Sequence, residues 1–171
     1  MSEKGAERVG VLIVGGGAGG LCMGARLRTE GRDDFVIIEK SDGVGGTWRD
    51  NTYPDAACDG PSHFYSFSFA PIPDGTRKWA KQPEILDYFE GLVSRFSLEA
   101  NLRLGTEVTE STWSDADCRW TVRTNDGRTW EADIVVNALG QLNMPHVPDI
   151  AGLADFGGTV FHSARWDHDH D

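Results

Sequence analysis

A glycine-rich turn between an apolar run and a helical segment constrains the fold of this chain more than any other feature. Residues 9–14 have the composition of a buried strand, and residues 21–29 have that of a helix. Between them lies Gly15-Gly-Gly17-Ala-Gly-Gly20, a G-x-G-x-x-G pattern. A second apolar run, Phe35–Ile38, follows the helical segment and ends at Glu39. The order is therefore strand, glycine turn, helix, strand and acid.

Each of the three glycines in the G-x-G-x-x-G pattern has a structural role that a larger residue could not fill. Gly15 permits the tight turn that leaves the strand, Gly17 lets a pyrophosphate approach the backbone, and Gly20 lets the helix pack on the sheet. The N-terminus of the helix offers free N–H groups to phosphates. Glu39 lies 19 residues after Gly20, close to the spacing at which a carboxylate accepts hydrogen bonds from a ribose. The pattern predicts a bound adenine dinucleotide; the alternative is a glycine-rich turn without a ligand.

Composition narrows the class of partner. The 171 residues carry a net charge of −11, which argues against nucleic acid or an anionic membrane surface. No apolar run approaches the roughly 20 residues that span a bilayer, and residues 1–8 do not resemble a signal peptide. Cys22, Cys58 and Cys118 form no C-x-x-C pair, so a dithiol redox centre is not expected. Free thiols without an export signal predict a cytoplasmic protein.

The region after Glu39 departs from the pattern of a plain nicotinamide dehydrogenase. A stretch rich in glycine, proline and aromatic residues runs from Ser41 to Lys81 where a second crossover helix would normally begin. Loops of this length in compact domains are usually functional, and a disordered linker would carry fewer large rings. We expect an ordered loop around a ligand, in which the aromatic residues from Phe64 to Phe69 form core under the loop rather than a substrate pocket.

A helix and several short strands complete the expected domain. Residues 82–96 have helical spacing, with Pro83 in the first turn. Strands are expected at 102–104, in a three-stranded antiparallel meander at 107–114, 119–124 and 128–132, and in a separate buried strand at 133–137. This order predicts an α/β fold of the FAD/NAD(P)-binding Rossmann-like type, in which a β-meander replaces one crossover helix of a parallel sheet.

Three further motifs make the interpretation specific. They are Gly45-Gly46-Thr47-Trp48 followed by Tyr53-Pro54 and Asp59, then Ala138-Leu139-Gly140, then Phe156-x-Gly158-x-x-x-His162-x-x-x-Trp166-Asp167. Together with the first glycine turn, they resemble the class B flavoprotein monooxygenases, and most closely the FAD-binding part of the Baeyer–Villiger monooxygenases. The resemblance covers nearly the whole chain after residue 8. Two positions depart from the family pattern, since Asp55 replaces a usual Gly or Met and Leu139 replaces a usual Thr.

The resemblance implies a bound FAD and the residues that hold it. The implied contacts are Gly15, Gly17, Ala18, Gly20, Glu39, Lys40, Gly46, Thr47, Trp48, Asp59, Tyr65, Val108, Ala138 and Gly140. Asp59 is also implied to be catalytic, because in the family an acid at this place pairs with an arginine that stabilises the peroxyflavin anion. The alternative is that Asp59 is a loop cap after Cys58, because aspartate favours turns.

The third motif implies a segment between two domains. In the family, Phe156, Gly158, His162, Trp166 and Asp167 belong to a linker, and the role of His162 is conformational; alone, it would be a surface histidine. The implied organisation is a flexible N-terminus at 1–8, an FAD-binding domain at 9–155 and the linker at 156–171, with the NADPH-binding domain absent. The fold is thus expected to be truncated, whether the chain is a fragment, a truncated gene product or one part of a split protein.

The end of the sequence also raises the possibility of a metal site. His168 and His170 alternate with Asp167, Asp169 and Asp171. No second cluster of ligands supports a defined geometry, so we expect a solvated acidic chain end and no metal.

The function implied by the resemblance is an NADPH- and O₂-dependent monooxygenase. Such enzymes convert ketones to esters or lactones, or oxygenate sulfur or nitrogen, through a C4a-peroxyflavin formed on FAD. The substrate would be a small molecule, and the 171-residue chain alone is not expected to complete the cycle. Two alternatives stay open. One is a non-catalytic remnant or interaction module with the same fold; the other is a different two-dinucleotide flavin oxidoreductase, such as a disulfide reductase, which the missing C-x-x-C pair disfavours.

Overall fold

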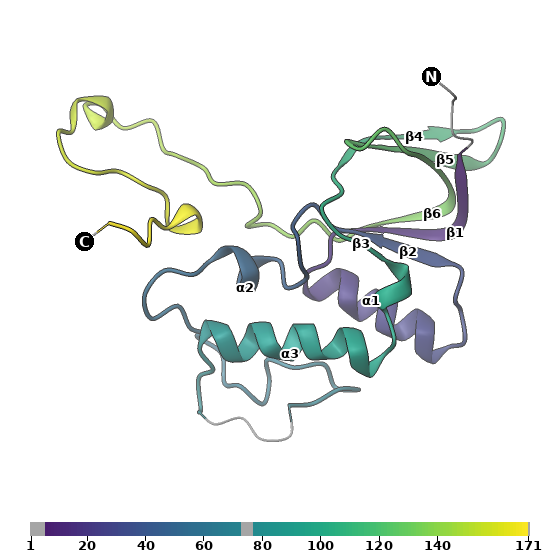
Figure 1. The fold of residues 1–171 in the computed structure, drawn as a ribbon, viewed down its shortest axis with the longest axis horizontal. Helices are drawn as coiled ribbons and strands as arrows, with labels where there is room; N and C mark the ends of the chain where they lie inside the picture. The colour runs from purple at the N-terminus through teal and green to yellow at the C-terminus, as the bar shows by residue number, and fades with distance from the viewer. Residues whose placement is uncertain (1–5, 73–76, 171) are drawn as a thin grey trace.

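A computed structural model describes residues 6–72 and 77–170 of the chain. Its centre is a six-stranded sheet with the order β3-β2-β1-β6-β5-β4 (Figure 1). Residues 1–5 of the expected flexible N-terminus, Pro73 and Gly75 of the expected loop, and Asp171 of the expected acidic end lie outside the described residues.

The parallel half of the sheet carries the glycine turn. β1 (Glu7–Val14) lies between β2 (Phe35–Ile38) and β6 (Thr129–Asn137), parallel to both, and the short β3 (Leu102–Arg103) adds to the edge beside β2. β1 starts two residues before the apolar run, because Glu7 and Arg8 pair with the first half of β6. The bounds of β2 are those predicted.

The antiparallel half is the predicted meander, with one correction. β4 (Val108–Ser114) pairs with β5 (Arg119–Thr124), which pairs with the beginning of β6. The strands expected at 128–132 and 133–137 are one strand, because residues 130–132 pair with β5 on one side and β1 on the other. The second half of this strand was expected to be buried, but it is partly exposed. Ile134 is 53 % exposed, since α1 packs over β1 and β2 and leaves the β6 side of that face open.

Two helices and the meander cover opposite faces of the parallel strands. α1 (Ala18–Thr29) and α3 (Gln82–Arg95) lie together on one face, and the meander curls over the other (Figure 1). The helical core cluster includes Ile13, Leu21, Ile37, Ile85, Phe89, Leu92 and Leu98. The opposite cluster joins Leu12, Val14, Val36 and Ile38 to Val122, Trp130 and Ala132 of the meander strands. Burial of these apolar side chains supplies the main driving force for folding.

Within residues 41–72 and 77–81, the long segment after β2 packs around the helices. It contains one short helix, α2 (Thr47–Asp50), which the sequence did not predict. Phe67 and Phe69 stack at 5.3 Å between ring centroids and pack against the helical core cluster, as expected for core under a loop. Phe64 differs, because 78 % of it is exposed.

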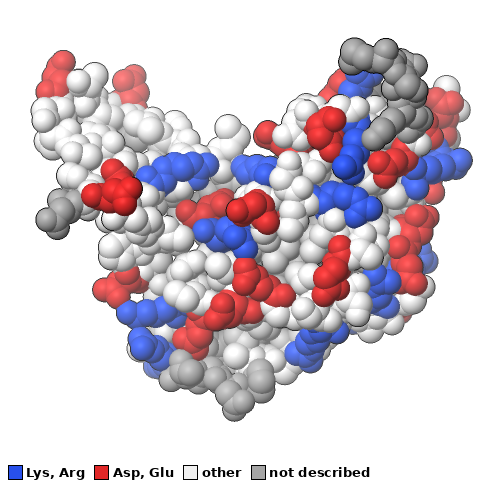
Figure 2. Space-filling model, in the orientation of Figure 1, with Lys and Arg blue, Asp and Glu red and all other residues white. Residues whose placement is uncertain are grey.

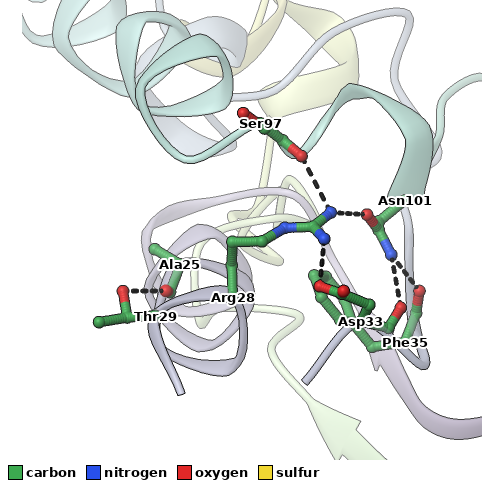
Figure 3. A network of polar contacts seen from close by, with 7 residues as sticks. All are labelled: Ala25, Arg28, Thr29, Asp33, Phe35, Ser97 and Asn101. Carbon is green, nitrogen blue, oxygen red and sulfur yellow. Dashed lines mark hydrogen bonds and ion pairs between the residues drawn. The ribbon is translucent and has the colours of Figure 1, made fainter. Parts of the chain in front are cut away.

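A polar network fixes the start of β2 (Figure 3). Arg28, near the end of α1, contacts the Asp33 carboxylate and the Asn101 side chain, and it donates to the Ser97 carbonyl at 3.0 Å. Asn101, in the 3₁₀ helix η1 (Glu99–Asn101), donates to the Phe35 carbonyl at 2.7 Å. The network ties α1 and the segment after α3 to β2, whose far end carries Glu39.

The residues after β6 form an extended tail that includes two further 3₁₀ helices, η2 (Leu153–Asp155) and η3 (Ser163–Arg165). The tail runs outward from β6 and turns back, so that η3 lies over α2 (Figure 1). The space-filling view shows the tail and the sheet domain on the two sides of a notch, with acidic and basic side chains interspersed on this face (Figure 2).

Candidate functional site

A cavity of about 550 Å³ opens at the carboxyl ends of the three central parallel strands. Val14, Ile38 and Ala138, at or just after the ends of β1, β2 and β6, all line it. In open α/β sheets, ligands bind outside the carboxyl ends of the strands. The first glycine turn lies at this same edge, so the predicted dinucleotide motif and the cavity coincide.

The first glycine turn is held by backbone contacts that leave no room for side chains. Gly15 has φ of 109° and donates its N–H to the Ile38 carbonyl at 2.8 Å. A Cβ on Gly15 would lie 2.5 Å from the Ala138 carbonyl oxygen, and one on Gly20 would lie 1.8 Å from the Gly15 carbonyl oxygen. The turn therefore requires glycine at both positions, and Gly17 becomes the N-cap of α1.

The second glycine turn packs directly on the first. The Gly45 N–H donates to the Gly16 carbonyl at 3.0 Å, and a Cβ on Gly46 would lie 3.1 Å from the Gly17 Cα. Gly46 has φ of 52° and precedes α2. This close approach of two backbones brings the Gly-Gly-Thr-Trp motif to the cavity beside the start of α1.

Arg49 anchors the second turn from behind. Its Nε donates to the Val44 carbonyl at 2.8 Å, and its Nη2 forms an ion pair with Glu90 of α3 at 2.6 Å. Charge-assisted hydrogen bonds of this kind are stronger than neutral ones. The position of the second turn is thus set by α3 as well as by the first turn.

Glu39 is a buried acid that joins the first glycine turn to the end of β2. The residue is only 6 % exposed and lines the cavity. Its Oε2 accepts from the Gly16 N–H at 2.6 Å, and its Oε1 accepts from the Ser41 N–H at 2.7 Å. A carboxylate offers about four lone-pair sites, so acceptor capacity remains for the hydroxyl groups of a ligand.

Two aromatic residues form another part of the cavity wall. The Trp48 indole N–H donates to the Tyr65 hydroxyl at 2.8 Å, and the two rings meet edge to face at 5.6 Å. The Gln82 side chain at the start of α3 donates to the Trp48 carbonyl. The Trp48–Tyr65 pair is therefore fixed from α3, and it gives the cavity an aromatic surface.

Comparison with known proteins identifies the family. A profile described as pyridine nucleotide-disulphide oxidoreductase matches residues 12–170. The chain belongs to this family.

Similar proteins of known name include Baeyer–Villiger monooxygenases. A Baeyer–Villiger monooxygenase of Streptomyces coelicolor is 51% identical over 169 residues, which cover 99% of this chain and 32% of the relative. One of Pseudomonas aeruginosa is 46% identical, with coverage of 97% and 32%. The crystal structure of cyclohexanone monooxygenase from Rhodococcus sp. Phi1 bound to NADP⁺ superposes with a TM-score of 0.82 at 37% identity, covering 97% of this chain and 32% of that one.

These similarities confirm the predicted fold and the predicted resemblance to Baeyer–Villiger monooxygenases. The chain spans about a third of the length of these relatives, in agreement with the expected truncation of the fold. The family description names disulphide chemistry, but the three cysteines of this chain are free: Cys22 is half-buried, Cys58 buried and Cys118 exposed. The sequence places no second cysteine near any of them.

Most residues implied to hold the cofactor lie together around the cavity. Those that line it are Gly15, Gly17, Ala18, Glu39, Lys40, Gly46, Thr47, Trp48, Tyr65, Val108, Ala138 and Gly140. Gly20 is buried behind the turn and is not among the lining residues. Asp59 is exposed and also does not line the cavity, so its catalytic role stays a prediction.

Several lining residues were not predicted. They are Val14, Gly19, Ile38, Gly45, Asp50, Thr106, Glu107, Leu139, Asn143, Met144, Pro145 and Arg165. Thr106 and Glu107 directly precede Val108, so their proximity could have been inferred. Met144 and Pro145 lie on the outgoing part of the tail, soon after β6, whereas Arg165 reaches the cavity because the tail turns back. No local sequence pattern indicates this return.

The third motif orders the tail locally. A Cβ on Gly158 would lie 2.6 Å from the Phe156 ring. The His162 Nδ1 accepts from the Ala164 N–H at 3.0 Å, which caps η3, and Trp166 meets Phe161 edge to face at 4.9 Å. Asp167 accepts from the Asp169 N–H at 3.0 Å. These contacts give motif residues local roles within the tail, whereas the linker role and the domain boundaries stay predictions.

The histidines at the end of the tail are candidate metal ligands by residue type alone. His168 Nε2 lies 2.8 Å from the Thr52 hydroxyl. Within residues 6–72 and 77–170, no three His, Cys, Asp or Glu side chains are grouped so that they could hold a metal ion. No helix in the same part of the chain is long and apolar enough to cross a membrane.

Proposed function

We propose that this chain is the FAD-binding portion of an NADPH- and O₂-dependent monooxygenase of the Baeyer–Villiger type. The observation that carries the proposal is the position of Glu39, a buried carboxylate joined to the glycine turn at the mouth of the cavity. A ribose beside it and a pyrophosphate at the start of α1 are the parts of an adenine dinucleotide that this arrangement fits.

The cavity residues suit FAD in their chemistry. The two glycine turns leave backbone without side chains where the phosphates would lie, and Trp48 and Tyr65 offer an aromatic surface to the flavin. The indole N–H of Trp48 is already satisfied by Tyr65, so the pair can bind and exclude water without leaving a donor unpaired. When bound, FAD supplies hydride acceptance and oxygen activation, while the protein supplies position and electrostatics.

Asp59 has a proposed role that depends on the rest of the protein. In the described part of the chain it forms no ion pair. We propose that it orients an arginine supplied by residues outside these 171, since a developing anion needs a positioned cation. The substrate is proposed to be a small ketone or a sulfur or nitrogen compound. The free cysteines support a cytoplasmic location.

The decisive experiment is FAD binding by the purified chain. We expect the chain to bind FAD, seen as a shifted visible flavin spectrum and quenched flavin fluorescence on titration. We also expect no NADPH-dependent oxygen uptake, because about two thirds of the relatives' length is not in these residues. A folded chain that neither shifts the spectrum nor quenches the fluorescence of added FAD would favour the non-catalytic module instead, and oxygen uptake driven by NADPH would refute the expected lack of turnover.

A further inference from the structure

The tail brings a cation back to the cofactor cavity. Arg165 in η3 lines the same cavity as the first glycine turn, although the two are 145 residues or more apart in sequence. The return is held at two places. Ala164 is buried, and His168 lies in hydrogen-bond contact with Thr52, two residues after α2. Met144 and Pro145, from the outgoing part of the tail, line the cavity as well.

Arg165 is placed by a folded turn. Its backbone N–H donates to the His162 carbonyl at 2.8 Å, while His162 caps the same turn through its Nδ1. Edge-to-face packing of Trp166 on Phe161 closes the turn on its other side. The histidine and the tryptophan of the third motif thus flank Arg165 and fix its backbone at the cavity.

The charges that line the cavity indicate why a cation at Arg165 would favour binding of an anionic ligand. The cavity has three acidic lining residues, Glu39, Asp50 and Glu107, and two cationic ones, Lys40 and Arg165. In the described part of the chain, neither cation forms an ion pair with a carboxylate. The whole protein carries −11. A dinucleotide brings two further negative charges, so its binding depends on the cations that meet it.

The Arg165 guanidinium has unused N–H donors that could bind an anion. Within the described residues, Arg165 uses its side chain only for one hydrogen bond, from Nη1 to the Ala164 carbonyl at 2.5 Å. A guanidinium has five N–H donors in a planar fork that matches phosphate oxygens. Lys40, in contrast, reaches Asn143 at 3.3 Å and lies next to the ribose acid Glu39.

We propose that Arg165 binds the pyrophosphate of the dinucleotide held in this cavity, so that the returning tail closes the site by supplying its second cation. The proposal rests on the proposed FAD-binding function. It assigns to the His-x-x-x-Trp segment a direct electrostatic contribution to cofactor binding.

The test compares dissociation constants for FAD among variants of the whole chain, measured by quenching of flavin fluorescence. Arg165→Met should weaken FAD binding by about tenfold at low salt, the effect of one charge-assisted contact. Arg165→Lys should recover part of this loss, because lysine keeps the charge and lacks the fork. The difference between the unaltered chain and Arg165→Met should shrink at high salt, because ions screen the interaction.

Two controls separate this role from general effects. Arg32→Met removes the same charge from an exposed position outside the cavity and should leave FAD affinity unchanged. Competition by ADP, which has a pyrophosphate, should weaken in Arg165→Met, while competition by adenosine should not. Circular dichroism melting identifies any variant that fails to fold; if Arg165→Met fails, Arg165→Gln replaces it in the same titrations.

The outcomes are distinct. If the unaltered chain binds no FAD, the proposed function fails. If it binds FAD and folded Arg165→Met binds equally well, the proposed function stands and the role of Arg165 is overturned. Equal weakening of adenosine and ADP competition would also overturn it, since the effect would then not come from phosphate.

Discussion

The carboxylate of Glu39 accepts a hydrogen bond from the backbone N–H of Gly16 at 2.6 Å, which joins the end of β2 to the turn after β1. A Cβ on Gly16 would lie 3.1 Å from the Glu39 Cβ, so the acid and the turn are also in close steric contact. The acid of the dinucleotide motif is therefore part of the turn's own structure, and its replacement should affect both stability and binding.

Glu39→Gln should destabilise the fold and weaken FAD binding. Both carboxylate oxygens accept backbone N–H groups, and a glutamine amide would turn an NH₂ group toward one of them. Leaving a buried donor unsatisfied costs about 1–3 kcal/mol, so the free energy of unfolding in urea should fall by that amount. Glu99→Gln, at an exposed position in η1, is the control and should have little effect. Unchanged stability in Glu39→Gln would contradict the role of this contact.

Gly20→Ala and Gly91→Ala should have opposite effects, although both glycines lie in helices. A Cβ on Gly20 would lie 1.8 Å from the Gly15 carbonyl oxygen, whereas one on Gly91 in α3 would meet nothing within 4 Å. Gly20→Ala must displace the turn and should abolish FAD binding or folding. Gly91→Ala should raise the unfolding free energy by about 0.5–1 kcal/mol through helix propensity. Urea unfolding of both variants tests the contrast. Similar free energies of unfolding would show that the close contact between Gly20 of α1 and the Gly15 carbonyl does not require glycine.

The sequence predicted the elements whose signals are local. β2 and β5 have the predicted bounds because each is a short apolar or alternating run between turn residues. The division of β6 was wrong, because its continuity depends on pairing with β1 and β5 at once, which is a property of the sheet. The exposure of Ile134 likewise depends on where α1 lies.

In the site, too, the residues placed by local sequence signals could be predicted, and those placed by distant contacts could not. Residues of both glycine turns and Glu39 line one cavity, because the first turn and Glu39 follow strand ends and the second turn packs on the first. That they bind the cofactor stays a prediction. Arg165 could not be placed from sequence, because its position depends on the return of the tail and on the Thr52–His168 contact. Asp59, expected in the site from resemblance alone, is exposed outside the cavity.

Arg49→Met should loosen the second glycine turn. The variant loses the hydrogen bond to the Val44 carbonyl and the ion pair with Glu90, which together should cost about 1–3 kcal/mol. Glu90→Gln removes only the ion pair from a half-exposed site and should cost at most about 1 kcal/mol. Hydrogen exchange provides a local readout, because the Gly45 N–H that donates to Gly16 should exchange faster in Arg49→Met. Unchanged exchange there would show that the first turn alone holds the second.

Tyr88→Phe should change how stability depends on pH in the alkaline range. The Tyr88 hydroxyl donates to the Ala70 carbonyl at 2.8 Å and accepts from the Phe67 N–H at 2.9 Å. Burial raises the pKa of the Tyr88 phenol above its ordinary value of about 10. The unfolded chain therefore loses this proton at a lower pH than the folded chain, so the stabilisation is complete below pH ~10 and declines as pH rises toward the folded-state pKa.

Urea unfolding between neutral pH and pH ~11 measures this dependence. Tyr88→Phe should be less stable than the unaltered chain at neutral pH, because it leaves the Ala70 carbonyl and Phe67 N–H without their partner. Its stability should then fall less steeply above pH ~10. Tyr53→Phe, at an exposed position, should keep the steep decline of the unaltered chain. If Tyr88→Phe declined as steeply, the proton lost in that range would belong to another group, and the half-buried Tyr88 phenol would not account for the loss of stability.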